Sequence, residues 1–172
     1  MIRRIFMGLI AASAAMLLVV TPAMASSQAK SQTLPGGLGK ITSNAWRTTG
    51  DGSLSGNTRQ WDYQVSAVYE GSQTVQRIRA TWWGGASLRN GASISLGLSG
   101  SGVSVGFGSN WQYVETVHKY WENTNGAKTS SWRSNMIVAP EGDYRNSTIF
   151  IANEALVKVK NDARTFQITA SA

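Results

Sequence analysis

The chain contains no cysteine, so it can form neither a disulfide bond nor a lipid-modified cysteine anchor. It has a single histidine, His118, and this excludes a metal site built from several histidine side chains. No G-x-S-x-G motif is present, and His118 lies in the middle of a predicted strand. The chain is also short of acids, with nine Asp and Glu, and no two of them stand in a motif that defines a catalytic pair. These absences favour a non-enzymatic function, with no catalytic residue, metal or other cofactor predicted.

The first 25 residues have the three parts of a secretory signal peptide. Arg3 and Arg4 are basic, the run Ile5–Val20 is apolar, and a cleavage pattern of the A-x-A type ends at Ala25. We expect cleavage after Ala25 rather than retention as a membrane anchor, because the apolar run is short for a membrane span. The two arginines also resemble a twin-arginine signal, but Ile2 stands where such signals carry Ser or Thr, which favours the ordinary secretory route. Either route predicts a secreted or extracytoplasmic protein.

Residues 26–172 have the size of one ordinary domain. Charged residues make up only 15% of the chain, which nevertheless carries a net charge of +7, while Gly, Ser and Trp are abundant. This composition is typical of an exported all-β protein, and the positive charge favours anionic partners such as cell-wall polymers, acidic glycans or lipid headgroups over nucleic acid. The polar, turn-rich stretch 26–59 predicts a flexible leader, and the β domain is expected at 60–172.

The clearest predicted strand begins at Gln60, where large apolar side chains alternate with polar ones. One face carries five apolar residues: Trp61, Tyr63, Val65, Ala67 and Tyr69. Turn signals separate further strand-like stretches at 74–83, 111–122, 128–138, 148–152, 155–160 and 164–170. No stretch after the signal has helical periodicity. We therefore predict an all-β fold, an antiparallel β-sandwich or flattened barrel of about eight or nine strands.

The stretch 92–110 alternates small and apolar residues on both sides of a Gly/Ser linker. It predicts a β-hairpin with a bare Gly/Ser face and one apolar face, formed by Ile94, Leu96, Leu98, Val103, Val105 and Phe107. A bare face allows a second sheet, a ligand or lipid to come close. Two interpretations stay open, a buried hairpin of the sandwich and a membrane-active hairpin, although each arm is shorter than the roughly nine to eleven residues of a spanning strand.

Aromatic residues supply the most informative pattern for binding. The chain has seven Trp and five Tyr, several of them next to Arg or Lys. Planar rings stack on sugars, and a neighbouring cation suits polar or anionic ligands. Trp82 and Trp83 are adjacent in a predicted strand and so point to opposite faces, with Trp82 expected in the core and Trp83 outside. The residues that we expect to contact a ligand are Trp83, Trp121, Arg79 and Lys119.

The middle of the chain also carries a resemblance. The run Arg79-Ala80-Thr81-Trp82-Trp83, followed by Ile94-Ser95-Leu96 and Gly102-Val103-Ser104-Val105, resembles uncharacterised small exported all-β proteins of Gram-positive bacteria. The resemblance implies export and an all-β body, and it assigns no catalytic or binding residue.

The leading hypothesis from these features is a non-enzymatic binding module of the cell envelope. Its partner would be a glycan or an anionic wall polymer, contacted through surface aromatics and Arg or Lys. The alternative is a membrane-active or antibacterial secreted protein that uses the hairpin 92–110 on a membrane surface. An envelope hydrolase is the least favoured of the three classes.

Overall fold

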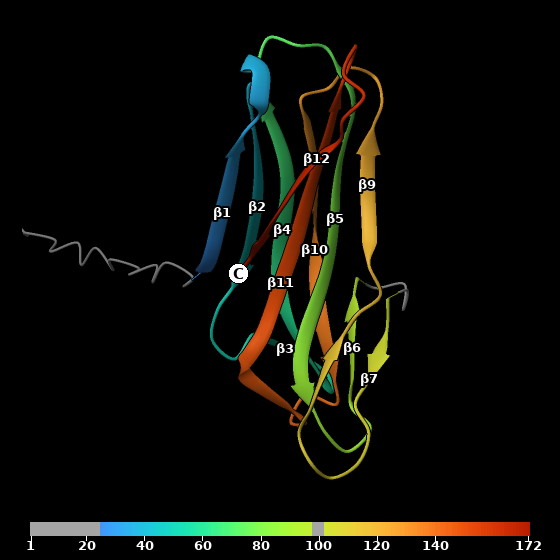
Figure 1. Cartoon of the computed structure of the whole chain (residues 1–172). Helices are drawn as coiled ribbons and strands as arrows, with labels where there is room; N and C mark the ends of the chain where they lie inside the picture. The colour runs from blue at the N-terminus through green and yellow to red at the C-terminus, as the bar shows by residue number, and fades with distance from the viewer. Residues whose placement is uncertain (1–24, 98–101) are drawn as a thin grey trace, which may run out of the picture.

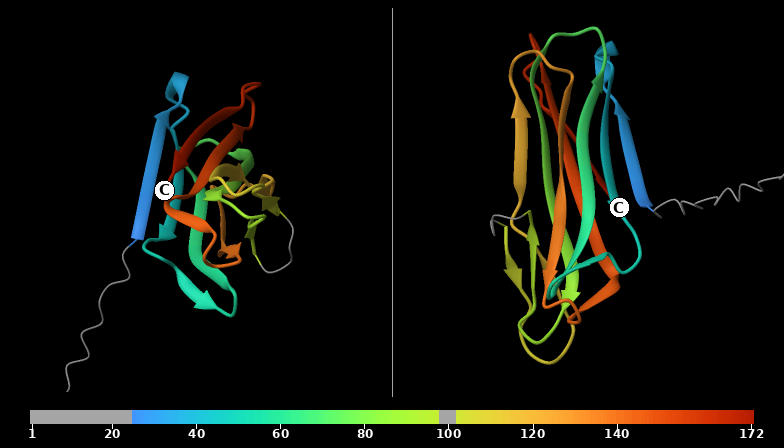
Figure 2. Two further views of the ribbon diagram at one scale, coloured as in Figure 1. Left: turned by 90° about the horizontal axis from the view of Figure 1, so that it is seen from below. Right: turned by 180° about the vertical axis from the view of Figure 1, so that it is seen from behind.

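The computed structural model describes residues 25–97 and 102–172. In this part of the chain two antiparallel β-sheets face each other and form an elongated sandwich, and the one helical segment is a short 3-10 turn, η1 (Pro35–Gly37) (Figure 1, Figure 2). No helix among these residues is long and apolar enough to cross a membrane. The predicted all-β, antiparallel fold is confirmed. It has twelve strands in the described residues, more than the predicted number.

The first sheet has the strand order β1-β2-β4-β10-β6-β7, and β3 pairs with β4. Its strands are β1 (Ala25–Thr33), β2 (Lys40–Thr48), β3 (Ser53–Ser55), β4 (Thr58–Glu70), β6 (Ser93–Leu96), β7 (Ser104–Val105) and β10 (Thr129–Ala139). The second sheet has the order β12-β11-β5, and both β8 and β9 pair with the other edge of β5. Its strands are β5 (Val75–Leu88), β8 (Gln112–Glu115), β9 (Lys119–Asn123), β11 (Tyr144–Val159) and β12 (Phe166–Ser171). The edge strands β7, β8 and β9 lie on the same side of the sandwich (Figure 1).

The core lies between the sheets and is built from the faces that alternation predicts. All five apolar residues of the predicted β4 face are buried. The facing strand β5 contributes Ile78, Ala80 and Trp82, which are also buried. Trp61 Nε1 donates a 3.0 Å hydrogen bond to the Gly50 carbonyl, so the polar atom of this fully buried side chain is satisfied. Burial of each large side chain contributes about 1.5–3 kcal/mol to folding.

The segment 26–59 is not the flexible leader that its composition predicts, because it forms β1, β2 and β3. β2 pairs with β4 along its length, and Ile41 and Ala45 are buried in the core. The polar residue between them, Ser43, is also buried, since its hydroxyl donates a 2.7 Å hydrogen bond to the Asn153 carbonyl. The buried side chains of Ile41, Ser43 and Ala45 therefore anchor β2 in the sandwich, although most of its residues are polar. Residues 1–24 of the predicted signal peptide lie outside the described residues.

The Gly/Ser hairpin forms, but its two arms do not share one apolar face. β6 and β7 pair in the register Ile94↔Ser104 and Ser93↔Val105, and directly paired residues lie on the same face of a sheet. The apolar residues of the first arm, Ile94 and Leu96, are therefore buried in the core. Those of the second arm are exposed: Val103, Val105 and Phe107. The predicted common face is wrong because the register offsets the arms by one residue. Leu98 lies outside the described residues.

The predicted strand 111–122 is interrupted by a β-bulge at 116–118. Gly85 pairs with Glu115, whereas Trp82 pairs with Lys119, so this segment has one residue more than β5 between the two pairs. Thr116 holds the bulge: its N–H donates to the Gly84 carbonyl at 2.8 Å, and its hydroxyl oxygen accepts from the Gly84 N–H at 3.0 Å. The extra residue inverts the alternation of β9, and as a result Lys119 and Trp121 face the space between the sheets.

Candidate functional site

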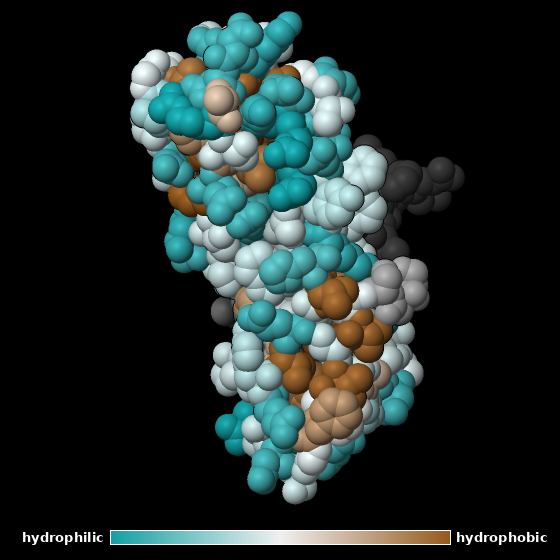
Figure 3. Space-filling view, turned by 45° about the vertical axis from the view of Figure 1, so that its right-hand side comes forward, coloured by the Kyte–Doolittle hydropathy of each residue, from teal (hydrophilic) through white to brown (hydrophobic). Residues whose placement is uncertain are grey.

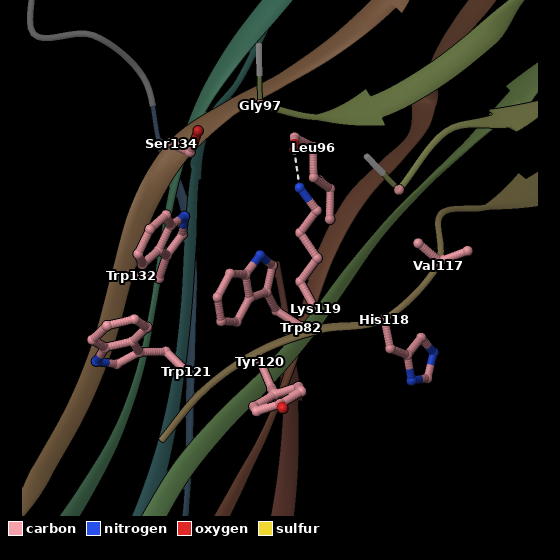
Figure 4. A pocket seen from close by; sticks show the side chains of 11 residues that line it. Trp82, Leu96, Gly97, Val117, His118, Lys119, Tyr120, Trp121, Trp132 and Ser134 are labelled. Atoms are coloured by element: carbon pink, nitrogen blue, oxygen red, sulfur yellow. Dashed lines mark hydrogen bonds between the residues drawn. The ribbon is translucent and has the colours of Figure 1, made fainter. Parts of the chain in front are cut away.

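A cleft of about 650 Å³ lies where β9 of the second sheet faces β6 and β10 of the first (Figure 4). It lies between two places where the sheet edges meet. On one side the Ser130 hydroxyl donates to the Trp121 carbonyl at 2.7 Å, and on the other the Ser104 hydroxyl donates to the Glu115 carbonyl. The lining is mostly aromatic and apolar: Trp82, Leu96, Gly97, Gly102, Val117, His118, Lys119, Tyr120, Trp121, Trp132 and Ser134. An apolar concavity with a few polar groups is the common form of a ligand site.

Three indoles form a continuous series from the core to the solvent. Trp82 lies at the base, 2% exposed, and its Nε1 donates a 3.0 Å hydrogen bond to the Tyr63 hydroxyl. Trp132 stacks on Trp82 with ring centroids 5.8 Å apart, and Trp121 lies 5.7 Å from Trp132 at a tilt of 38° (Figure 4). Trp121 and Trp132 remain 48% and 41% exposed. The cleft therefore offers large, partly uncovered aromatic surfaces held in place by a buried neighbour.

Lys119 places a positive charge in this cleft. Its ammonium donates a 2.7 Å hydrogen bond to the Leu96 carbonyl and so links β9 to β6 (Figure 4). Burial lowers the pKa of Lys119 from its ordinary value. Gly102 lies against the same side chain, since a Cβ at this position would come within 3.1 Å of Lys119 Cε. No carboxylate is among the described residues that line the cleft.

The four ligand-contacting residues predicted from the sequence divide between two faces. Trp121 and Lys119 line the cleft. Trp83 and Arg79 lie on the outer face of the second sheet, where Trp83 stacks on His118 at 4.3 Å and the Arg79 guanidinium lies 5.7 Å from the Tyr120 ring centroid. The structure therefore does not bring the four together. The predicted division of Trp82 and Trp83 between core and outside is confirmed.

Sequence reasoning did not select Trp132, although a signal for it exists. Alternation in 128–138 places Trp132 on the face of Met136 and Val138, both of which are buried. Trp132 faces the same way but lies at the cleft, where part of its ring stays exposed. Its neighbour Arg133 makes it one of the Trp–cation pairs of the sequence.

Replacing Tyr63 by Phe should loosen the base of the cleft. The Tyr63 ring is fully buried, burial raises its pKa, and its hydroxyl is the acceptor for Trp82 Nε1. Tyr63→Phe leaves that indole N–H buried without its acceptor, so the free energy of unfolding should fall by about 1–2 kcal/mol. Urea denaturation measures this change. Tyr120→Phe, which alters an exposed ring, is the control, and equal stability of both variants would contradict the assignment.

The cleft offers a ligand indole surfaces for stacking and the Ser134 hydroxyl for hydrogen bonding. It holds no pair of carboxylates among its described lining residues. In residues 25–97 and 102–172, no group of three or more His, Asp or Glu side chains could hold a metal ion. No protein-family model matches this chain, and no curated protein matches it either.

Proposed function

We propose that this protein is an exported, non-enzymatic binding module of the cell envelope, and that its aromatic cleft binds glycans that carry anionic groups. The observation that carries the proposal is the pair of partly exposed indoles, Trp121 and Trp132, whose ring centroids lie 5.7 Å apart and which line the same cleft as Lys119. Export is proposed from the signal-peptide pattern of residues 1–25.

A sugar ring suits the two indoles because its C–H faces are apolar and its rim is polar. An indole presents a large flat surface that costs little conformational entropy to hold in place, and Trp132 is already fixed by its stack on Trp82. The rim of a sugar would find hydrogen-bonding partners in the Ser134 hydroxyl and in backbone groups of the lining. Stacking on indoles therefore supplies affinity, and the few polar groups supply orientation.

The charge of the cleft favours an anionic ligand over a cationic one. Aromatic cages can also bind quaternary ammonium groups through cation–π attraction. Here the Lys119 ammonium lies in the cleft and would repel a second cation, and no carboxylate in the described lining would offset that repulsion. Without Arg3 and Arg4 of the proposed signal peptide, fourteen Lys and Arg stand against nine Asp and Glu, and this net charge of +5 would also attract acidic wall polymers.

Co-sedimentation with insoluble Gram-positive cell wall tests this function. The wall is used before and after chemical removal of its phosphate-bearing polymers. We expect retention on both, stronger on the untreated wall, with a part that persists in about 1 M salt because stacking is not screened. Absence of retention on both preparations would contradict the proposal.

A further inference from the structure

The strand β7 and its flanks show an inverted pattern of side chains. The positions that face the interior carry Gly102, Ser104 and Gly106, whereas the positions that face outward carry Val103, Val105 and Phe107. Strands of a soluble sandwich normally place apolar residues inward and polar residues outward. Steric crowding explains why the inward positions carry small residues, but it does not explain the apolar residues at the outward positions. A Cβ on Gly106 would lie 2.7 Å from Leu88 Cβ, so the interior has no room for a larger residue there.

Packing against the core does not explain why the outward positions of this segment carry apolar residues. Val103, Val105 and Phe107 are 42%, 39% and 69% exposed, and Val117 on the neighbouring bulge is 57% exposed. Figure 3 shows apolar side chains gathered on this side of the molecule, in the half that holds β6 to β8. Among the described residues, all but one of the large hydrophobic side chains that are exposed belong to the stretch 103–132. A grouping of this kind marks an interaction surface rather than scattered surface hydrophobics.

We propose that this apolar patch, formed by Val103, Val105, Phe107 and Val117, docks onto the surface of an anionic lipid bilayer. Its size fits a lipid surface better than a second copy of the chain. Four side chains expose on the order of a few hundred Å², whereas a stable protein interface buries about 800 Å² on each partner. Peripheral binding to a bilayer needs only a few inserted apolar side chains and a favourable charge.

The surroundings of the patch also fit a bilayer. Tyr113 and Tyr120, which are 57% and 66% exposed, lie on the outer face of β8 and β9. Tyr and Trp are the residues enriched at membrane–water interfaces, where one part of the ring is apolar and another is wet. The chain has sixteen Lys and Arg, of which only Arg3 and Arg4 precede the described residues, against nine Asp and Glu, so its charge complements acidic headgroups.

Docking by this patch would place the cleft at the membrane surface. Val117 belongs to the patch and also lines the cleft, and Gly102, another lining residue, directly precedes Val103. This surface differs from the predicted membrane-active hairpin, because Ile94 and Leu96 stay in the core and only the second arm meets the lipid. The docking itself does not depend on glycan binding, and a bilayer without sugar tests it.

The test is sedimentation of the purified protein with vesicles of phosphatidylcholine and phosphatidylglycerol. We expect binding that strengthens with the phosphatidylglycerol content and weakens in high salt. Val105→Ser/Phe107→Ser should weaken binding at least tenfold, because both side chains lose apolar area that would enter the bilayer. Leu54→Ser is the matched control, since Leu54 is 60% exposed on β3, away from the patch, and it should bind as the wild type does.

Three results would overturn the proposal. The first is a wild-type protein that does not bind the anionic vesicles, and the second is a double variant that binds as tightly as the wild type. The third is a dimer of the wild type in sedimentation equilibrium that the double variant abolishes, since the patch would then join two copies of the chain. Thermal unfolding of the double variant should match that of the wild type, because both substituted side chains are exposed.

Discussion

Replacing Asn153 by Ala should lower the free energy of unfolding by about 3–4 kcal/mol. Asn153 lies on β11 and is fully buried between the sheets. Its Nδ2 lies within hydrogen-bonding distance of three acceptors on the first sheet: the Ser43 hydroxyl at 2.9 Å, the Asn44 carbonyl at 3.2 Å and the Ser66 carbonyl at 2.9 Å. Alanine removes the donor, leaves the buried Ser43 hydroxyl and the part-buried Asn44 and Ser66 carbonyls without it, and opens a void.

Equilibrium unfolding in urea measures the change in the free energy of unfolding that Asn153→Ala causes. Asn110→Ala, at an exposed position, is the control, and it should change the stability by less than about 0.5 kcal/mol. A loss at Asn153 no larger than that of the control would show that the polar link between the sheets contributes little to the fold.

The double substitution Trp121→Ala/Trp132→Ala should weaken retention on cell wall by about 10- to 100-fold, which corresponds to about 1–3 kcal/mol for two lost stacking surfaces. Both indoles are partly exposed and line the cleft, so their loss removes aromatic surface that a sugar would cover. Each single variant should show a smaller loss of retention than the double variant. Co-sedimentation with untreated wall at several protein concentrations gives the affinities.

The control for this pair is Trp46→Ala. Trp46 is a half-buried indole on β2, near the Arg133 guanidinium and not among the residues that line the cleft. This variant tests whether the loss of a tryptophan outside the cleft also weakens retention on cell wall. Thermal unfolding of each variant separates lost binding from lost folding. Equal retention of the double variant and the Trp46 variant would argue against the cleft as the site.

Strict alternation allowed the central strands to be predicted from the sequence. In β4 the large apolar residues recur at every second position, and a register slip of one residue would expose all of them, so the buried face is determined locally. The same reasoning separates Trp82 from Trp83. The segment 26–59 escaped prediction because only Ile41 among the buried positions of β2 is large and apolar, while Ser43 and Ala45 are polar or small. Ser43 becomes a core residue only through its bond to β11.

The candidate site depends on pairing between strands that are far apart in the sequence. Alternation alone cannot locate a bulge, and the bulge at 116–118 results from Thr116 bonding to Gly84 on β5. Asn153 is a similar case. The sequence predicts a break between the strands 148–152 and 155–160, but β11 continues from Tyr144 to Val159, because the Asn153 side chain finds partners on the first sheet. Polar residues with long-range partners were thus interpreted as turns or surface.

The most direct test of a glycan-binding cleft is a titration of ¹⁵N-labelled protein, followed through the indole N–H signals of its seven tryptophans. The ligand is a set of soluble fragments released enzymatically from the same cell wall, and single substitutions assign the signals. We predict that the signals of Trp121 and Trp132 shift with saturation, while that of Trp46 stays in place. Saturable shifts confined to tryptophans outside the cleft, or no shift at any fragment concentration, would contradict the assignment of this cleft as the binding site.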